Sequence, residues 1–178
     1  RDRYKIKNLC LAGGVALNCV ANGKILKQKI FENIWIQPAA GDAGGSLGAA
    51  LAYWHRELEK PREEFKDKMQ GSYLGPKFEN NLIEQKLKSL NANYRKYSKD
   101  ETISLTAKVL ANEKTVGWFQ GRMEFGPRAL GGRSILADPR NSEAQKKINL
   151  KIKFRESFRP FAPIVLEEAA QKFFENCK

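Results

Sequence analysis

The chain has 178 residues, of which 42% are hydrophobic and 29% charged, and 32 Lys and Arg against 20 Asp and Glu give it a formal net charge of +12. This length suits one domain or two small ones, with enough apolar residues for a buried core. No apolar run approaches the roughly 20 residues that a membrane-spanning helix needs. The positive charge predicts an anionic partner, which could be a nucleotide, a nucleic acid, an acidic lipid or an acidic protein.

The cysteines indicate the cellular compartment of the protein, and the first residues bear on whether the sequence is complete. Cys10, Cys19 and Cys177 follow no metal-binding spacing. An odd number of cysteines without a recognisable signal peptide indicates reduced thiols and a cytoplasmic location. The first residue is not Met, and a strand-like run follows almost at once. We therefore expect the sequence to be a piece of a longer protein.

The first part of the chain repeats one pattern, a short apolar run followed by a glycine turn and a helical segment. The predicted elements are a strand over 8–12 (NLCLA), the Gly13-Gly14 turn, a helix over 15–28, a strand over 33–37 (NIWIQ), the turn 38–45 (PAAGDAGG) and a helix over 46–58. Such a repeat predicts an α/β protein with a parallel or mixed sheet.

A charged stretch over 57–70 is predicted to connect this part to the rest, with a domain junction near 69–76. The elements predicted beyond it are helices over 80–89 and 103–112, a strand over 115–120, a helix over 142–150, a strand over 161–166 and a helix over 167–175. Asn141 or Ser142 is expected to cap the 142–150 helix.

The two glycine turns are candidate ligand sites. Glycines after a strand let the backbone approach a ligand closely, and the next helix offers free N–H groups to a phosphate or ribose. Asp42, in the second turn, could bind a metal or a sugar hydroxyl. Alternatively, the glycines only make tight turns and Asp42 caps a helix. Two such turns favour a nucleotide or metal cleft, although His55, the one histidine, lies too far along the helix to complete a metal site.

A basic run over 121–163 is the sharpest feature, and it reads GRMEFGPRALGGRSILADPRNSEAQKKINLKIKFRESFRPFAP. Its Gly-Pro and Gly-Gly turns would hold Arg128 and Arg133 still, and guanidinium forks match phosphate oxygens. Alternation along an extended KFRESFRP segment would place three more cations on one face. The predicted phosphate site consists of Arg128, Arg133, Lys153, Arg155 and Arg159.

Three other interpretations of this run remain open. It could be a solvated basic face with structural Arg–Glu pairs, for which Glu124 and Glu156 are available. The interleaved phenylalanines could stack nucleic-acid bases beside a phosphate track. These are Phe119, Phe125, Phe154, Phe158 and Phe161. The segment could also be an interaction module that binds no nucleotide.

Five segments together resemble the O-carbamoyltransferases of the nodulation protein U, cephalosporin and tobramycin type. They are LAGGVALN (11–18), PAAGDAGGSLGAAL (38–51), YLGP (73–76), GRMEFGPRALGGRSILADPR (121–140) and KFRESFRPFAP (153–163). The resemblance covers almost the whole chain. It implies that residues 1–70 end an actin/sugar-kinase-like domain and that residues 71–178 begin a threonylcarbamoyl-adenylate-synthase-like α/β domain.

The resemblance also implies a chemistry. Carbamoyl phosphate and ATP would give carbamoyl adenylate, and the carbamoyl group would pass to a hydroxyl of a small-molecule acceptor. By motif position, the catalytic residues are Arg128, Lys153 and Arg159, the cofactor-binding residues are Gly13, Gly14, Asn18, Arg133 and Arg155, and Asp42 is a ligand of a divalent metal, with iron among the candidates.

The resemblance leaves other parts of the site outside this sequence, among them the family's histidine metal ligands and its acceptor-binding residues. We therefore expect the isolated 178 residues to be inactive. A membrane partner is not expected, and nucleic-acid binding is the less favoured alternative.

Overall fold

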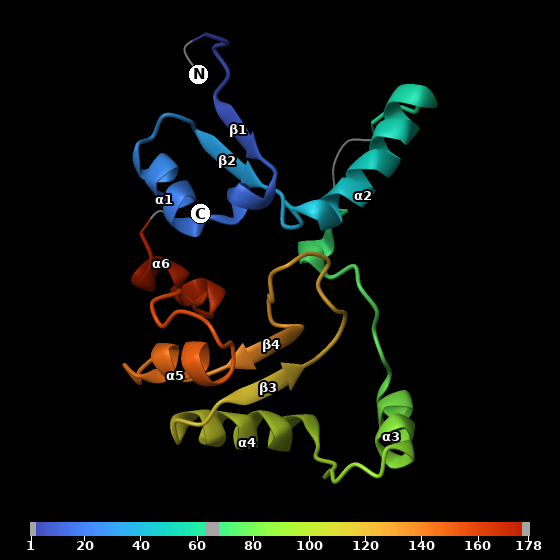
Figure 1. The fold of residues 1–178 in the computed structure, drawn as a ribbon, viewed down its shortest axis with the longest axis vertical. Coiled ribbons are helices and arrows are strands. Elements are labelled where there is room, and N and C mark those ends of the chain that lie inside the picture. Colours follow the sequence, from blue (N-terminus) through green and yellow to red (C-terminus); the bar gives the residue numbers. More distant parts are fainter. Residues whose placement is uncertain (1–2, 63–67, 176–178) are drawn as a thin grey trace. The chain divides into compact units, whose positions relative to one another are not determined.

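The computed structural model describes residues 3–62 and 68–175, which form a mixed α/β structure of short strands and helices (Figure 1). The chain divides into two compact units, Arg1–Tyr94 with Trp118–Ser134, and Arg95–Gly117 with Ile135–Lys178. The glycine-rich part of the basic run therefore belongs to the first unit, and the KFRESFRP part belongs to the second. The predicted domain boundary at residue 70 stays a prediction.

The first unit contains the predicted parallel strand pair. β1 (Asn8–Leu11) and β2 (Asn33–Ile36) pair in parallel, with Asn8 opposite Asn33 and Leu11 opposite Ile36. The Asn33 side-chain N–H also donates to the Asn8 side-chain oxygen at 2.8 Å. Figure 1 shows the two strands side by side, with α2 (Asp42–Ala52) following β2. The predicted strand, glycine turn and helix order of this region is confirmed.

The helices of these two repeats differ in detail from the prediction. The expected 15–28 helix is a 3-10 turn, Gly14–Leu17, followed by α1 (Cys19–Lys27). The break occurs because the Asn18 side chain accepts a hydrogen bond from the Ala21 N–H and so caps α1. In the second repeat, α2 begins at Asp42, earlier than predicted, since glycine-turn residues form its first turn, and it continues as a π-helical turn over Tyr53–Glu57.

The rest of the chain adds short helices and a second two-stranded sheet. These elements are a 3-10 turn (Gln70–Ser72), α3 (Asn80–Ser89), α4 (Lys99–Ala111), β3 (Val116–Phe119), β4 (Arg133–Leu136), α5 (Ala144–Lys151), a 3-10 turn (Glu167–Ala169) and α6 (Ala170–Phe173). The sheet consists of β3 and β4. Helix α4 begins before the predicted residue 103 because Ser98 and Glu101 form a reciprocal capping box. Glu143, not Asn141 or Ser142, is the N-cap position of α5, and its side chain makes no cap bond.

The strand predicted over 161–166 is wrong. This stretch has no regular secondary structure, although Leu166 is extended at φ −66° and ψ 141°. Within the described residues it joins neither of the two sheets, and a strand needs a neighbour's N–H and C=O groups. Ile164 and Leu166 are 74% and 69% exposed, so the apolar run that suggested a buried strand faces solvent here.

The apolar core of the described residues is small. Its buried apolar side chains are Ala16, Ala39, Ala40 and Ile148. The substantial core expected from composition is therefore not found in 3–62 and 68–175. Two-stranded sheets with strands of four residues are too narrow to cover a layer of helices, which leaves many large apolar side chains exposed. In the same residues, no helix combines the length and the apolar character that crossing a bilayer requires.

Candidate functional site

The glycine-rich part of the basic run folds around one buried carboxylate. Glu124 is 7% exposed, and its Oε1 accepts hydrogen bonds from the N–H groups of Leu130 and Gly132, both at 2.7 Å, and of Arg133 at 3.2 Å. We call residues 121–133 the Glu124 loop. Tight turns leave N–H groups without main-chain partners, and the carboxylate satisfies three of them at once.

The charge state of Glu124 follows from these contacts. Burial raises the pKa of the carboxyl, but hydrogen bonds from four backbone N–H groups, those of Leu130, Glu124 itself, Gly132 and Arg133, outweigh it. The pKa of Glu124 therefore lies below its usual range, and the group is an anion at neutral pH. The Arg–Glu alternative expected a side-chain ion pair, whereas this carboxylate binds the main chain of the loop.

Arg133 is bound within its own surroundings. Its Nη1 donates to the carbonyls of Gln120 and Gly132, both at 2.9 Å, and its Nη2 donates to the Gly121 carbonyl at 3.3 Å. The guanidinium also stacks 3.4 Å from the centre of the Phe119 ring. These contacts join the end of β3 to the start of β4. The predicted contact of Arg133 with a cofactor stays a prediction.

Arg128 extends toward the first glycine turn, which the sequence had suggested as a separate cleft. Its Nη2 donates to the Leu17 carbonyl at 3.2 Å. Gly126 lies close to the second glycine turn, because a Cβ added there would lie 3.1 Å from the Pro38 carbonyl oxygen and 3.2 Å from the Ala39 Cα. Within the first unit, the structure therefore brings Arg128 together with the 13–18 segment.

The residues of the first glycine turn and Asn18 differ in how closely their surroundings constrain them. Gly13 has φ +96°, a conformation that favours glycine, and its N–H donates to the Ala40 carbonyl at 2.6 Å. A Cβ added at Gly14 would meet nothing within 4 Å, so the space beside it is open. The side chain of Asn18 caps α1. The predicted roles of these residues in nucleotide binding stay predictions.

The described residues do not complete a metal site. Asp42 is exposed in the first turn of α2, where its charge favours the helix N-terminus. The N-cap is Gly41, so Asp42 is not the capping residue that the alternative interpretation expected. No cluster of three or more His, Cys, Asp or Glu side chains that could hold a metal occurs in 3–62 and 68–175. We assign no chemical step to a metal.

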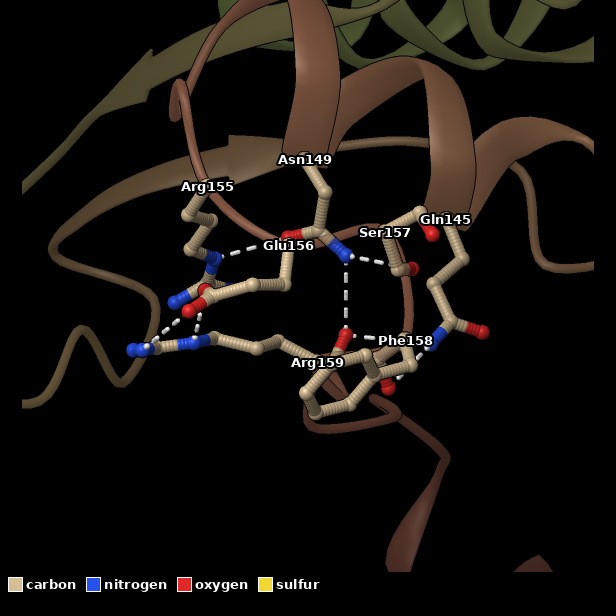
Figure 2. Close-up of polar contacts among 7 residues, drawn as sticks. All are labelled: Gln145, Asn149, Arg155, Glu156, Ser157, Phe158 and Arg159. Carbon is tan, nitrogen blue, oxygen red and sulfur yellow. Dashed lines mark hydrogen bonds and ion pairs between the residues drawn. The ribbon is translucent and has the colours of Figure 1, made fainter.

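The second basic segment forms a turn around a buried amide, as Figure 2 shows. Asn149, on α5, is 0% exposed. Its Nδ2 donates to the carbonyls of Ser157 at 3.0 Å and Arg159 at 2.9 Å, and its Oδ1 accepts from the Arg155 Nε at 2.7 Å. Gln145, one helical turn earlier, donates to the carbonyls of Phe158 at 3.2 Å and Arg159 at 3.0 Å. We call residues 152–159 the Asn149 loop.

The cations of the Asn149 loop are less constrained than Arg133. Arg155 lies 4.9 Å from the centre of the Phe161 ring, and among the described residues no acceptor contacts its two terminal nitrogens. The Nε of Arg159 pairs with the Glu156 carboxylate at 2.7 Å. The Glu156 N–H, the Arg159 guanidinium and the charge of Arg155 lower the pKa of the Glu156 carboxyl. The Lys153 ammonium has no ion-pair partner in the described part of the chain.

The extended alternation predicted for KFRESFRP is wrong. The segment turns and bends, and Phe154 has φ +48°, which few non-glycine residues adopt. Three main-chain bonds from the loop back to α5 impose this geometry, among them Lys153 N–H to Ile148 O at 2.9 Å and Arg155 N–H to Asn149 O at 3.0 Å. The cations are therefore placed by helix-end contacts rather than by a strand.

The sequence-predicted cations thus form two groups, each with its own buried anchor. Arg128 and Arg133 lie in the first unit, and Lys153, Arg155 and Arg159 lie in the second. Sequence reasoning missed the anchors. The Gln-x-x-x-Asn spacing of Gln145 and Asn149, which places two amides on one face of a helix just before a basic turn, could have indicated the second.

Comparisons with known proteins agree with the motifs. The carbamoyltransferase N-terminus model matches residues 1–51, and the carbamoyltransferase C-terminus model matches residues 107–178. An uncharacterized protein of Synechocystis, sll1178, is 61% identical over 98% of this chain and 29% of its own length. Nodulation protein NolO of Bradyrhizobium diazoefficiens is 49% identical over 98% of the chain and 32% of its own length.

A more distant relative has a similar coverage. Nodulation protein U of Rhizobium fredii is 37% identical over 94% of the chain and 26% of its own length. The chain therefore spans about a third or less of the length of these relatives. Both family models match in the expected order: the N-terminus model includes the two glycine turns, and the C-terminus model includes both basic loops. The chain belongs to the carbamoyltransferase family.

Proposed function

We propose that the protein carrying this chain is an ATP-dependent O-carbamoyltransferase. Carbamoyl phosphate, ATP and one water would give carbamoyl adenylate, phosphate and pyrophosphate, and the carbamoyl group would then pass to a hydroxyl of a small-molecule acceptor. Family membership supports carbamoyl transfer. The observation that carries the adenylate step is the pair of ordered basic loops, whose fixed guanidinium groups suit phosphate oxygens.

The residues of this chain would contribute electrostatics and positioning. Arg128 in the first unit, and Lys153 and Arg159 in the second, would each neutralise charge on a substrate phosphate. Arg155 would add a guanidinium whose terminal nitrogens have no acceptor among the described residues. ATP supplies the adenylyl group that activates the carbamoyl group. The open space beside Gly14, with Arg128 bound to the Leu17 carbonyl in the same segment, fits a phosphate-bearing ligand.

Several finer points belong to the same proposal. The first part of the chain would end an actin/sugar-kinase-like domain, and the remainder would begin a threonylcarbamoyl-adenylate-synthase-like domain. Asp42 would be one ligand of a divalent metal whose other ligands are not among the described residues. Because the chain spans only 29% of the length of the Synechocystis relative, we also propose that the 178 residues alone do not catalyse carbamoyl transfer.

Pyrophosphate exchange into ATP, dependent on carbamoyl phosphate, tests the proposal in the full-length protein. Arg128→Ala and Lys153→Ala should each lower the exchange rate by at least about a hundredfold, as loss of a transition-state charge contact does. Lys27→Ala, which removes an exposed cation in the last turn of α1, is the matched control and should leave the rate unchanged. Exchange that survives both loop substitutions would contradict the assignment.

One observation favours the nucleic-acid alternative. Phe154 and Phe158, beside the cations of the Asn149 loop, are 84% and 77% exposed and could stack on bases. A single-stranded oligonucleotide should then bind with an affinity that falls steeply with salt. Such binding without carbamoyl-phosphate-dependent exchange would favour this alternative over carbamoyl transfer.

A further inference from the structure

The Asn149 side chain meets the Asn149 loop at three points, and both N–H groups and the oxygen of its amide are hydrogen-bonded. Both amide hydrogens go to loop carbonyls, Ser157 O and Arg159 O, and the amide oxygen accepts from Arg155 Nε. The residue is 0% exposed, so water cannot replace these partners. The surroundings therefore define which end of the amide is oxygen and which is nitrogen.

This arrangement leaves part of Arg155 free for a ligand. The bond to Asn149 uses Nε, while the two terminal nitrogens have no acceptor among the described residues. A guanidinium held at Nε presents its remaining donors in one plane, which suits two oxygens of one phosphate. The Phe161 ring beneath Arg155 restricts the same side chain further. Asn149 thus orients a cation and leaves its charge uncompensated, whereas a carboxylate at this place would orient the cation and neutralise it.

The carbonyl bonds connect the same amide to the main chain of the second arginine, Arg159. The main chain of Arg159 is held by Asn149 and also by Gln145. Figure 2 shows Glu156 reaching the Arg159 guanidinium from the same loop, and the charges of Arg155 and Arg159 both lower the pKa of the Glu156 carboxyl. Both guanidinium groups therefore lie near one carboxylate, where an exchangeable anion would also be attracted.

We propose that Asn149 is a positioning residue of the anion site and acts through Arg155, setting its guanidinium to receive a phosphate group of the substrate. The identity of that substrate as carbamoyl phosphate or ATP rests on the proposed function. The positioning role itself concerns binding of a phosphate-bearing anion, so it can be measured without turnover. Pyrophosphate, a product of the proposed reaction, is the probe.

The experiment is a double-mutant cycle in the full-length protein, with pyrophosphate affinity measured by calorimetry. Asn149→Ala should weaken binding about tenfold, and the loss should disappear when Arg155→Ala is already present, because the amide then has no cation to orient. Gln145→Ala is the matched comparison, since it removes amide bonds to the same loop but none to a guanidinium. It should lower the melting temperature while changing pyrophosphate affinity less than about twofold.

A second variant covers the case in which Asn149→Ala does not fold. Asn149→Asp keeps the size of the side chain and the acceptor for the Arg155 Nε but loses the donor to the Ser157 and Arg159 carbonyls. Its carboxylate would pair with Arg155 and weaken pyrophosphate binding about tenfold, again only when Arg155 is present. Additive losses in the cycle, wild-type affinity of the folded Asn149 variants, or absence of pyrophosphate binding to the wild type would each overturn the role.

The two proposals fail separately. Non-additive losses of pyrophosphate affinity in the cycle, without carbamoyl-phosphate-dependent pyrophosphate exchange, would support the positioning role and contradict the proposed function. Pyrophosphate exchange in the wild type, together with additive losses of pyrophosphate affinity in the cycle, would support the proposed function. Asn149 would then have only a structural role.

Discussion

The two basic loops are held by opposite kinds of buried group. In the Glu124 loop an anion accepts hydrogen bonds from N–H groups, whereas in the Asn149 loop a neutral amide donates to two carbonyls and accepts from one guanidinium. The difference follows the backbone, because the glycine turns direct N–H groups inward and the end of α5 faces carbonyls of the returning chain. Each loop thus has a buried partner that matches its unpaired main-chain groups.

The same difference extends to the arginines. Arg133 in the Glu124 loop is bound by several carbonyls and stacked on Phe119, so its guanidinium joins β3 to β4. Among the described residues, the guanidinium of Arg155 in the Asn149 loop is held only at Nε and at one aromatic ring. Basic residues that look alike in the sequence therefore differ in how many donors remain for a ligand.

Removal of the charged anchor gives the largest expected effect. Glu124→Ala leaves buried N–H groups without acceptors, at a cost of about 3 kcal/mol for the set. Hydrogen exchange of the amides of Leu130 and Gly132 should accelerate about a hundredfold, because local opening becomes that much easier. Amides of the Asn149 loop should change little. Glu113→Gln, which alters an exposed carboxyl, is the control.

Amide hydrogen exchange that accelerates equally in both loops after Glu124→Ala would contradict the view that each loop has its own anchor. A wild-type exchange rate at Gly132 would show that the carboxylate does not hold the turn.

The stability of the two loops should also depend differently on pH. The pKa of Glu124 is lowered in the folded protein, so the stability it contributes is fully present above the usual glutamate pKa of about 4.3 and is lost as pH falls through the folded value. Hydrogen exchange in the Glu124 loop, corrected for the intrinsic rate, should accelerate as the pH falls below the usual glutamate range and the carboxylate takes up a proton. Asn149 does not titrate, so the amide anchor should persist over the same range. A Glu124 loop whose protection falls with decreasing pH no more than that of the Asn149 loop would contradict this assignment.

Much of the local order was predictable from the sequence. Short apolar runs followed by glycine turns indicated β1, β2 and a parallel or mixed sheet, and an amphipathic pattern indicated helix α3. Ser98 and Glu101 stand at the S-x-x-E spacing of a capping box, so the true start of α4 was also available in the sequence. These features depend on neighbours within a few residues, where propensity and spacing carry most of the information.

Tertiary features were not predictable in the same way. The 161–166 run has strand composition but no ladder partner within the described residues. Alternation suggested that the cations of KFRESFRP share a strand face, whereas bonds back to the end of α5 turn the segment instead. The anchors Glu124 and Asn149 are polar residues in a charged context, and only the folded contacts show that they are buried.

Glu156 offers the smallest expected effect, because its carboxylate interacts with two cations of the Asn149 loop. Its exposed carboxylate pairs with Arg159 and also lies in the field of Arg155. Glu156→Gln should therefore tighten pyrophosphate binding about threefold at low salt, the modest size typical of an exposed ion pair. The gain should shrink at high ionic strength, since salt screens such charges.

The corresponding carboxylate of the other loop is the control for this prediction. Glu124→Gln removes a charge that is directed at N–H groups, so it should loosen the Glu124 loop and bring no gain in pyrophosphate affinity. Weaker binding by Glu156→Gln would mean that Glu156 orients Arg159 for the ligand instead of competing with it. In that case the Asn149 loop would need two anchors, one neutral and one charged, and the contrast between the loops would be one of degree.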